Sequence, residues 1–146
     1  ENLSLYGALN RKGDCGVQAL LFITLCRMNG VPARWQSGWY ANPIEPGNHD
    51  WAFFYVEPYG WLPVDCSFGG ARRENEAYRS FYFGNLDAFR MVSCKNHLAP
   101  LYPMPKHLRN DPYDNQSGEI QTTERAIEPE EVETKIEILS FEPIEE

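Results

Sequence analysis

The chain has no apolar run long enough to cross a membrane, and its start does not resemble a signal peptide. It also has few positive charges: 13 lysines and arginines face 21 aspartates and glutamates, for a formal net charge of -8 at pH 7. This balance argues against nucleic acid or an anionic membrane as the main partner. The first residue is Glu1 rather than methionine, so a removed leader with an extracytoplasmic location, or a companion N-terminal region, stays open.

Cysteine is sparse as well. The four cysteines are widely spaced, unlike those of a small disulfide-stabilised scaffold, so we expect mostly free thiols at Cys15, Cys26, Cys66 and Cys94. Neither a C-x-x-C nor an H-x-x-x-H pair occurs, which argues against a structural zinc site, the main alternative for the cysteine and histidine residues. The sequence has no internal repeat and gives no indication of a cofactor.

Apolar residues, in contrast, are plentiful. With 42% hydrophobic and 14% aromatic residues, the 146-residue chain can bury a core of its own. We expect a core domain over residues 1–118 and an acidic C-terminal segment over residues 119–146. Within that segment, residues 135–141 (KIEILSF) alternate in the manner of an edge strand.

Residues 15–28 form the clearest predicted helix. Asp14 is a good N-cap, and Gly30 followed by Pro32 ends the helical pattern. Apolar residues cover nearly the whole circumference, so we expect a helix that is buried on most sides. Cys15 then occupies the first helical position, where the positive end of the helix dipole lowers the pKa of a thiol. This position favours a nucleophile over the alternative of a small buried hydrophobic residue.

Beyond this helix the sequence alternates between strand patterns, turns and one short helix. We expect strands at 34–40, 49–57 and 61–65, a loop at 66–72, a short helix at 73–80, further strand material at 81–83 and 89–94, and irregular structure from 95 to 118.

His49 opens the strongest of these strands, and Asp65 ends the next one. Side chains alternate between the two faces of a strand, so the register decides whether these two residues share a face. If residue 57 pairs with residue 61, they share a face without lying opposite each other. Contact between them then needs a longer loop, a bulge or a bend. The sequence leaves this register open.

Four short motifs follow one another in the first half of the chain. They are Gly13-Asp14-Cys15, RMNGVPAR at 27–34, His49-Asp50-Trp51 and GWLPVD at 60–65. Together they resemble the transglutaminase-like superfamily of papain-like cysteine enzymes, in its bacterial type. This resemblance implies an α+β fold in which the helix that carries the cysteine packs on an antiparallel sheet.

The resemblance also implies a catalytic triad. Cys15 would be the nucleophile, His49 the general base and acid, and Asp65 the residue that holds the imidazole. The implied reaction is acyl transfer on a peptide or protein amide through a thioester, with hydrolysis by a protease or amidase preferred over cross-linking. A non-catalytic binding or scaffold module is the alternative. Members of the family usually carry an oxyanion-stabilising side chain upstream of the cysteine, whereas here the backbone N–H of Cys15 is the donor that can be placed.

Three further residues are candidates for contacts with a substrate. Trp35 and Trp51 could line a cleft, and packing in the core is the alternative for both. Arg34 could clamp a substrate, and an exposed or salt-bridged arginine is the alternative.

Overall fold

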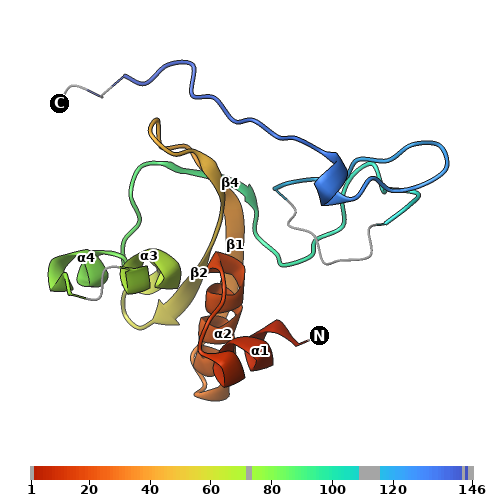
Figure 1. Ribbon diagram of the computed structural model, residues 1–146. Coiled ribbons are helices and arrows are strands. Elements are labelled where there is room, and N and C mark those ends of the chain that lie inside the picture. Colours follow the sequence, from red (N-terminus) through yellow and green to blue (C-terminus); the bar gives the residue numbers. More distant parts are fainter. Residues whose placement is uncertain (1, 72–73, 109–115, 143, 145–146) are drawn as a thin grey trace.

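The computed structural model describes residues 2–71, 74–108, 116–142 and 144. Four strands form one antiparallel sheet in the order β3-β2-β1-β4, and helices lie on both sides of it (Figure 1). The elements are α1 (Leu3–Asn10), α2 (Cys15–Met28), β1 (Ala33–Tyr40), β2 (Gly47–Val56), β3 (Gly60–Val64), α3 (Cys66–Ala71), α4 (Glu76–Phe81), β4 (Arg90–Cys94) and the 3-10 helix η1 (Pro129–Glu131). The predicted α+β class and antiparallel sheet are confirmed.

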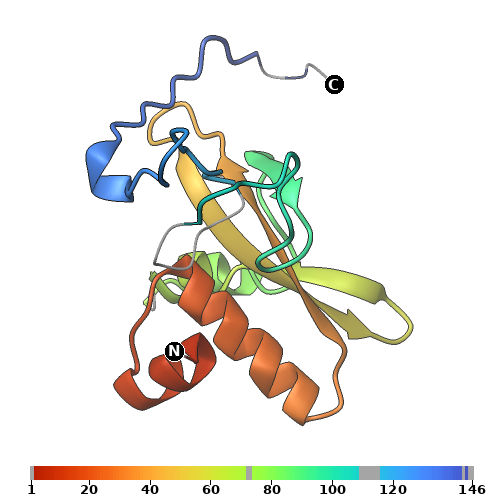
Figure 2. The same ribbon diagram turned by 90° about the vertical axis from the view of Figure 1, so that its right-hand side faces the viewer.

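Helix α2 begins and ends where the sequence predicts. The Asp14 carboxylate accepts a hydrogen bond from the Val17 amide at 2.9 Å, and Gly30 adopts a left-handed φ of 75° just after the helix. The burial is weaker toward the end of the helix, where Leu25 is 51% and Met28 77% exposed. Figure 2 shows the sheet on one side of α2 and α1 along another, and α3 also contacts the helix, so exposure is concentrated in its last turn.

The core lies between α2 and the sheet. Its buried members come from α2 and from the strands, and they are Ala19, Ile23, Ala33, Trp35, Ala52, Phe54 and Val64. Since Ala52 and Phe54 face α2, the alternation along β2 turns His49 and Trp51 toward the opposite face. Phe68 of α3 packs on that face against the His49 ring, while α3 also contacts α2 and α4.

The register between β2 and β3 is shifted by two residues from the pairing of residue 57 with residue 61, because Trp61 pairs with Tyr55. Val56 pairs with Gly60 and Ala52 with Val64, so odd positions still face odd positions. If this register is continued past β3, Asp65 falls opposite residue 51. Asp65 and His49 are then diagonal neighbours on the same face of the sheet. The two polar residues therefore come within reach without a bulge in β2.

Two local predictions after β3 are wrong. Residues 66–71 form α3 rather than a loop, because Asp65 caps the helix: its Oδ1 accepts hydrogen bonds from Ser67 Oγ and from the Phe68 amide, both at 2.9 Å. Residues 81–83 are not a strand, since Phe81 ends α4 and Phe83 makes only an isolated bridge to Val64.

Other predictions in the second half of the chain have mixed outcomes. The short helix and the last strand are confirmed as α4 and β4, although residues 72 and 73 lie outside the described part. Residues 135–141 form no strand, because their backbone pairs with none of the described strands, and Leu139 is fully open to solvent. None of the helices in the described ranges is long and apolar enough to cross a membrane.

Strand β4 attaches to β1 at a point that only glycine allows. A Cβ on Gly38 would lie 2.0 Å from the carbonyl oxygen of Met91, and the register shifts between Ser37 and Gly38. This close approach brings Arg90, the first residue of β4, opposite Tyr40. The end of β4 is thereby joined to the face of the sheet that carries His49.

Candidate active site

Cys15 is the first residue of α2 and is half-buried. Its thiol donates a hydrogen bond to Oδ2 of Asp50 at 3.4 Å. Asp50 is 3% exposed, and its other oxygen accepts a hydrogen bond from the side-chain amide of Gln116 at 3.0 Å. Gly16 leaves room for this arrangement, since a Cβ there would lie 3.1 Å from Asp50 Oδ2. The thiol is therefore held against a buried carboxylate.

This environment reverses the expected effect on the thiol. Burial is the largest cause and the charge of Asp50 the next, and together they raise the pKa of the Cys15 thiol to about 12. The prediction that the helix N-terminus lowers this pKa is thus wrong for the arrangement seen here. A helix terminus supplies only partial charge, whereas Asp50 places a full negative charge beside the sulfur.

His49 and Asp65 form the closest polar pair of the site. His49 Nε2 lies 2.6 Å from Asp65 Oδ2, and both side chains are buried. Burial opposes ionisation of Asp65, but the hydrogen bond and charge of His49, with the Phe68 amide and Arg90, hold the pKa of that carboxyl below its ordinary value. An ionised Asp65 can only accept, so Nε2 of His49 donates and Nδ1 is left as the basic nitrogen.

Aromatic rings enclose the His49 imidazole. Phe68 of α3 lies closest, with 4.5 Å between ring centroids, and Tyr40 and Trp51 each lie at 6.2 Å. These rings restrict the imidazole to one orientation and keep it 7% exposed. The pair of His49 and Asp65 is therefore both dry and fixed.

The structure brings two of the three predicted catalytic residues together. Among the described residues, no hydrogen bond joins Cys15 to His49, because the thiol is bound to Asp50 and the imidazole to Asp65. Asp50 and His49 are consecutive residues of β2, and their side chains point to opposite faces of the strand. The sulfur thus lies against the direct neighbour of the predicted base.

The three candidates for substrate contacts are all engaged within the chain. Trp35 belongs to the core, and the His97 ring stands edge-on against it with 5.0 Å between centroids. Trp51 is fully buried, and its indole N–H donates to Gln36 Oε1 at 2.7 Å. The exposed Arg34 stacks its guanidinium over Trp61, 4.3 Å from the ring centre. Their contacts with a substrate stay a prediction.

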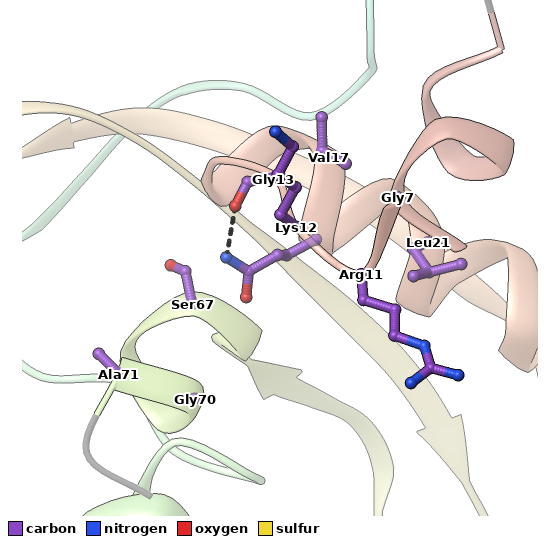
Figure 3. Close-up of a pocket in the computed structure, with 10 residues that line it drawn as sticks. Gly7, Arg11, Lys12, Gly13, Val17, Leu21, Ser67, Gly70 and Ala71 are labelled. Atoms are coloured by element: carbon purple, nitrogen blue, oxygen red, sulfur yellow. Dashed lines mark hydrogen bonds between the residues drawn. The ribbon is translucent and has the colours of Figure 1, made fainter. Parts of the chain in front are cut away.

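A cavity of about 450 Å³ lies between the start of α2 and α3 (Figure 3). Gly13 and Gln18 border it on one side, where the Gln18 amide donates to the Gly13 carbonyl at 2.8 Å. Ser67 and Gly70 border it from α3. The cavity therefore adjoins both the loop that leads to Cys15 and the serine that binds Asp65. Within the described ranges, no His, Cys, Asp or Glu side chains cluster in a way that could hold a metal ion.

Three residues of this site were not predicted from the sequence. Asp50 lies inside the His49-Asp50-Trp51 motif without a signal of its own, and nothing in the sequence connects it to Gln116, 66 residues further on. Arg90 donates to Asp65 at 2.7 Å, and a lone charge opening the strand RMVSC is the only signal that could have drawn attention to it.

One known family matches part of the chain. Residues 2–66, somewhat less than half of the chain, match the model of the transglutaminase-like superfamily. These residues are similar to that superfamily over this stretch. Its members are generally cysteine-dependent acyltransferases or proteases. The matched residues contain Cys15, His49 and Asp65, whereas Arg90 and Gln116 lie outside them. Comparisons with curated proteins and with solved structures give no match.

Proposed function

We propose that the transglutaminase-like core catalyses cysteine-dependent acyl transfer from an amide or peptide bond, with Cys15 as the nucleophile and water as the acceptor. The observation that carries this proposal is the buried pair of His49 and Asp65, 2.6 Å apart, within residues that match the superfamily. A buried, ionised aspartate that fixes the tautomer of a histidine is the arrangement that a general base requires.

The proposed reaction begins when the Cys15 proton moves to Nδ1 of His49. The sulfur attacks the amide carbon, and the backbone N–H of Cys15 at the start of α2 donates to the oxyanion. The C–N bond breaks, the imidazolium gives its proton to the leaving amine, and a thioester remains on Cys15. Water, deprotonated by His49, then releases the acid and regenerates the thiol.

Asp50 defines the resting state of this cycle. While the thiol donates to Asp50, it cannot donate to His49, so the Cys15 side chain must leave Asp50 before the proton transfer. We assign the movement of the Cys15 side chain away from Asp50 to the entry of a substrate into the cavity beside Gly13 and Ser67. The preference for water over an amine acceptor rests on the resemblance to compact members of the superfamily, and cross-linking is the alternative outcome.

A second candidate function is a non-catalytic transglutaminase-like binding or scaffold module. The hydrogen bond between Cys15 and Asp50 favours it, because a thiol with a pKa of about 12 is almost entirely protonated at neutral pH. Under this alternative the pair of His49 and Asp65 would serve only to connect β2, β3 and α3.

Amide hydrolysis of a peptide library distinguishes the two candidates. Cys15→Ala and His49→Ala should each abolish turnover, Asp65→Asn should keep a reduced rate, and the double variant of Cys15 and His49 should be no worse than either single one. Cys94→Ala and His107→Ala are matched controls outside the site and should keep the wild-type rate. Unchanged hydrolysis by Cys15→Ala would overturn the proposed mechanism.

A further inference from the structure

Arg90 is a buried cation at the first position of β4. Its side chain is 5% exposed, although it belongs to a strand whose next two residues are open to solvent. One end of the guanidinium, Nη1, donates to Asp65 Oδ2 at 2.7 Å. The other end donates to Asp87 Oδ2, from Nη2 at 2.9 Å and from Nε at 3.2 Å. The arginine thus bridges two carboxylates.

Aromatic rings surround this guanidinium and exclude water from it. The Cζ atom lies between 4.6 and 5.7 Å from the ring centres of Phe68, Tyr40, Trp51 and Tyr82. Three of these rings also lie against His49, namely Phe68, Tyr40 and Trp51. The arginine and the histidine therefore share one dry enclosure, where charges interact more strongly than in water.

Arg90 and His49 bind the same oxygen of Asp65. Oδ2 accepts from His49 Nε2 and from Arg90 Nη1, while Oδ1 accepts from Ser67 Oγ and the Phe68 amide. Four donors thus fix the plane of the carboxylate. Without the guanidinium, Oδ2 would keep only the histidine, and the carboxylate would be free to turn about the contacts of Oδ1.

We propose that Arg90 is a positioning residue of this site, which fixes Asp65 toward His49 and sets the charge of the enclosure in which the imidazole gains its proton. The effect on turnover rests on the proposed function, whereas the effect on the histidine does not. The functional unit then extends to β4, beyond the residues that match the superfamily.

The charges of this cluster predict the direction in which each substitution shifts the pH dependence of kcat/KM. Asp65, Asp87 and Arg90 sum to one negative charge when His49 is neutral, and a protonated imidazole brings the sum to zero. Arg90→Gln adds one negative charge to the sum and favours the imidazolium, so the acid limb of kcat/KM should move to higher pH. Asp87→Asn removes one and should move that limb to lower pH. A merely structural role would not give opposite displacements.

The experiment compares wild type, Arg90→Gln, Arg90→Lys and Asp87→Asn. Each protein is measured for its pH–rate profile and for the NMR signal of the proton on His49 Nε2. A short hydrogen bond moves this signal far downfield, and its loss in His49→Ala assigns it. Arg90→Gln should lose this signal and about 100-fold in kcat, with KM little changed. Arg90→Lys keeps the charge, so it should recover part of the rate and leave the acid limb in place.

Arg125→Gln is the matched control, because it breaks an exposed arginine–carboxylate pair, with Glu131, far from the site in sequence. If Arg90→Gln fails to fold, the reduced rate of Arg90→Lys and the shifted acid limb of Asp87→Asn decide. An acid limb that does not move in Arg90→Gln or Asp87→Asn, or a rate of Arg90→Lys equal to that of wild type, would overturn the role of Arg90. If the wild type shows no turnover, the proposed function fails, and the downfield signal and its pH dependence still test the role of Arg90.

Discussion

The thiol of Cys15 donates to the carboxylate of Asp50, with 3.4 Å between sulfur and oxygen. Asp50 directly precedes Trp51 and follows His49, so the residue that holds the nucleophile at rest is the neighbour of the residue proposed to activate it. Because Gln116 binds the other oxygen of Asp50, the C-terminal half of the chain also contributes to this resting state.

Replacing Asp50 should make the thiol more reactive. Asp50→Asn removes the negative charge that helps to raise the pKa of Cys15 to about 12. Alkylation of Cys15 by iodoacetamide at pH 7 should then accelerate roughly tenfold or more, since reactivity follows the thiolate fraction. Peptide mass mapping measures the rate, and Cys26 in the same sample is the internal control. An equal or slower rate at Cys15 would show that Asp50 does not restrain the thiol.

Asp65 should make the fold sensitive to acid. Because its pKa is lower in the folded chain, the unfolded chain binds more protons as the pH falls. The stabilisation is fully present above the unfolded pKa of about 3.9 and is lost as the pH falls toward the folded value. Urea unfolding at neutral and at acidic pH should therefore show a smaller acid loss for Asp65→Asn than for wild type. Glu130→Gln, at an exposed carboxylate of η1, should behave as wild type; equal losses in all three proteins would refute the linkage.

Gly38 should be irreplaceable where β1 meets β4. Gly38→Ala puts a methyl group 2.0 Å from the Met91 carbonyl oxygen, so β4 must shift or detach. We expect a loss of about 2 kcal/mol or more in the free energy of unfolding, with displacement of Arg90. Gly47→Ala is the matched control, because a Cβ there meets nothing within 4 Å. Equal stability of the two variants would mean that β4 tolerates the shift.

The cavity between α2 and α3 should respond to filling. A Cβ on Gly70 would meet only the Gln18 side chain, at 3.8 Å, so Gly70→Leu fits and projects into the cavity. If a substrate enters there, KM should rise several-fold while kcat changes little. Gly47→Leu, at an open position, is the control. An unchanged KM would place the substrate elsewhere.

Local signals in the sequence were sufficient for the first half of the fold. The N-cap at Asp14, the break at Gly30 and the alternating strands around the turn at residues 57–60 depend on neighbouring residues, so they could be predicted. The segment 135–141 alternates like a strand, but it has no pairing partner among the described strands, and pairing is a tertiary property. The alternation within residues 135–141 could therefore not decide whether they form a strand.

The site was predictable only in part for the same reason. The contact between His49 and Asp65 depends on a register that is shifted by two residues from the pairing of residue 57 with residue 61, and odd positions face each other in both registers. The environment of Cys15 depends on Asp50 across 35 residues and on Gln116 across 66. A cap rule describes the helix terminus but not the carboxylate that tertiary packing brings to it. The sequence therefore suggested a lowered thiol pKa where the folded chain raises it.

Mass spectrometry of a trapped acyl-enzyme tests the central claim most directly. Wild type is mixed with an activated acyl donor, quenched in acid within the first turnover, and digested. The account predicts an acyl adduct on the peptide that contains Cys15, its absence in Cys15→Ala, and slower formation in His49→Ala. Turnover of the donor without any adduct on Cys15, or an adduct that forms equally fast on Cys66 and in His49→Ala, would contradict it.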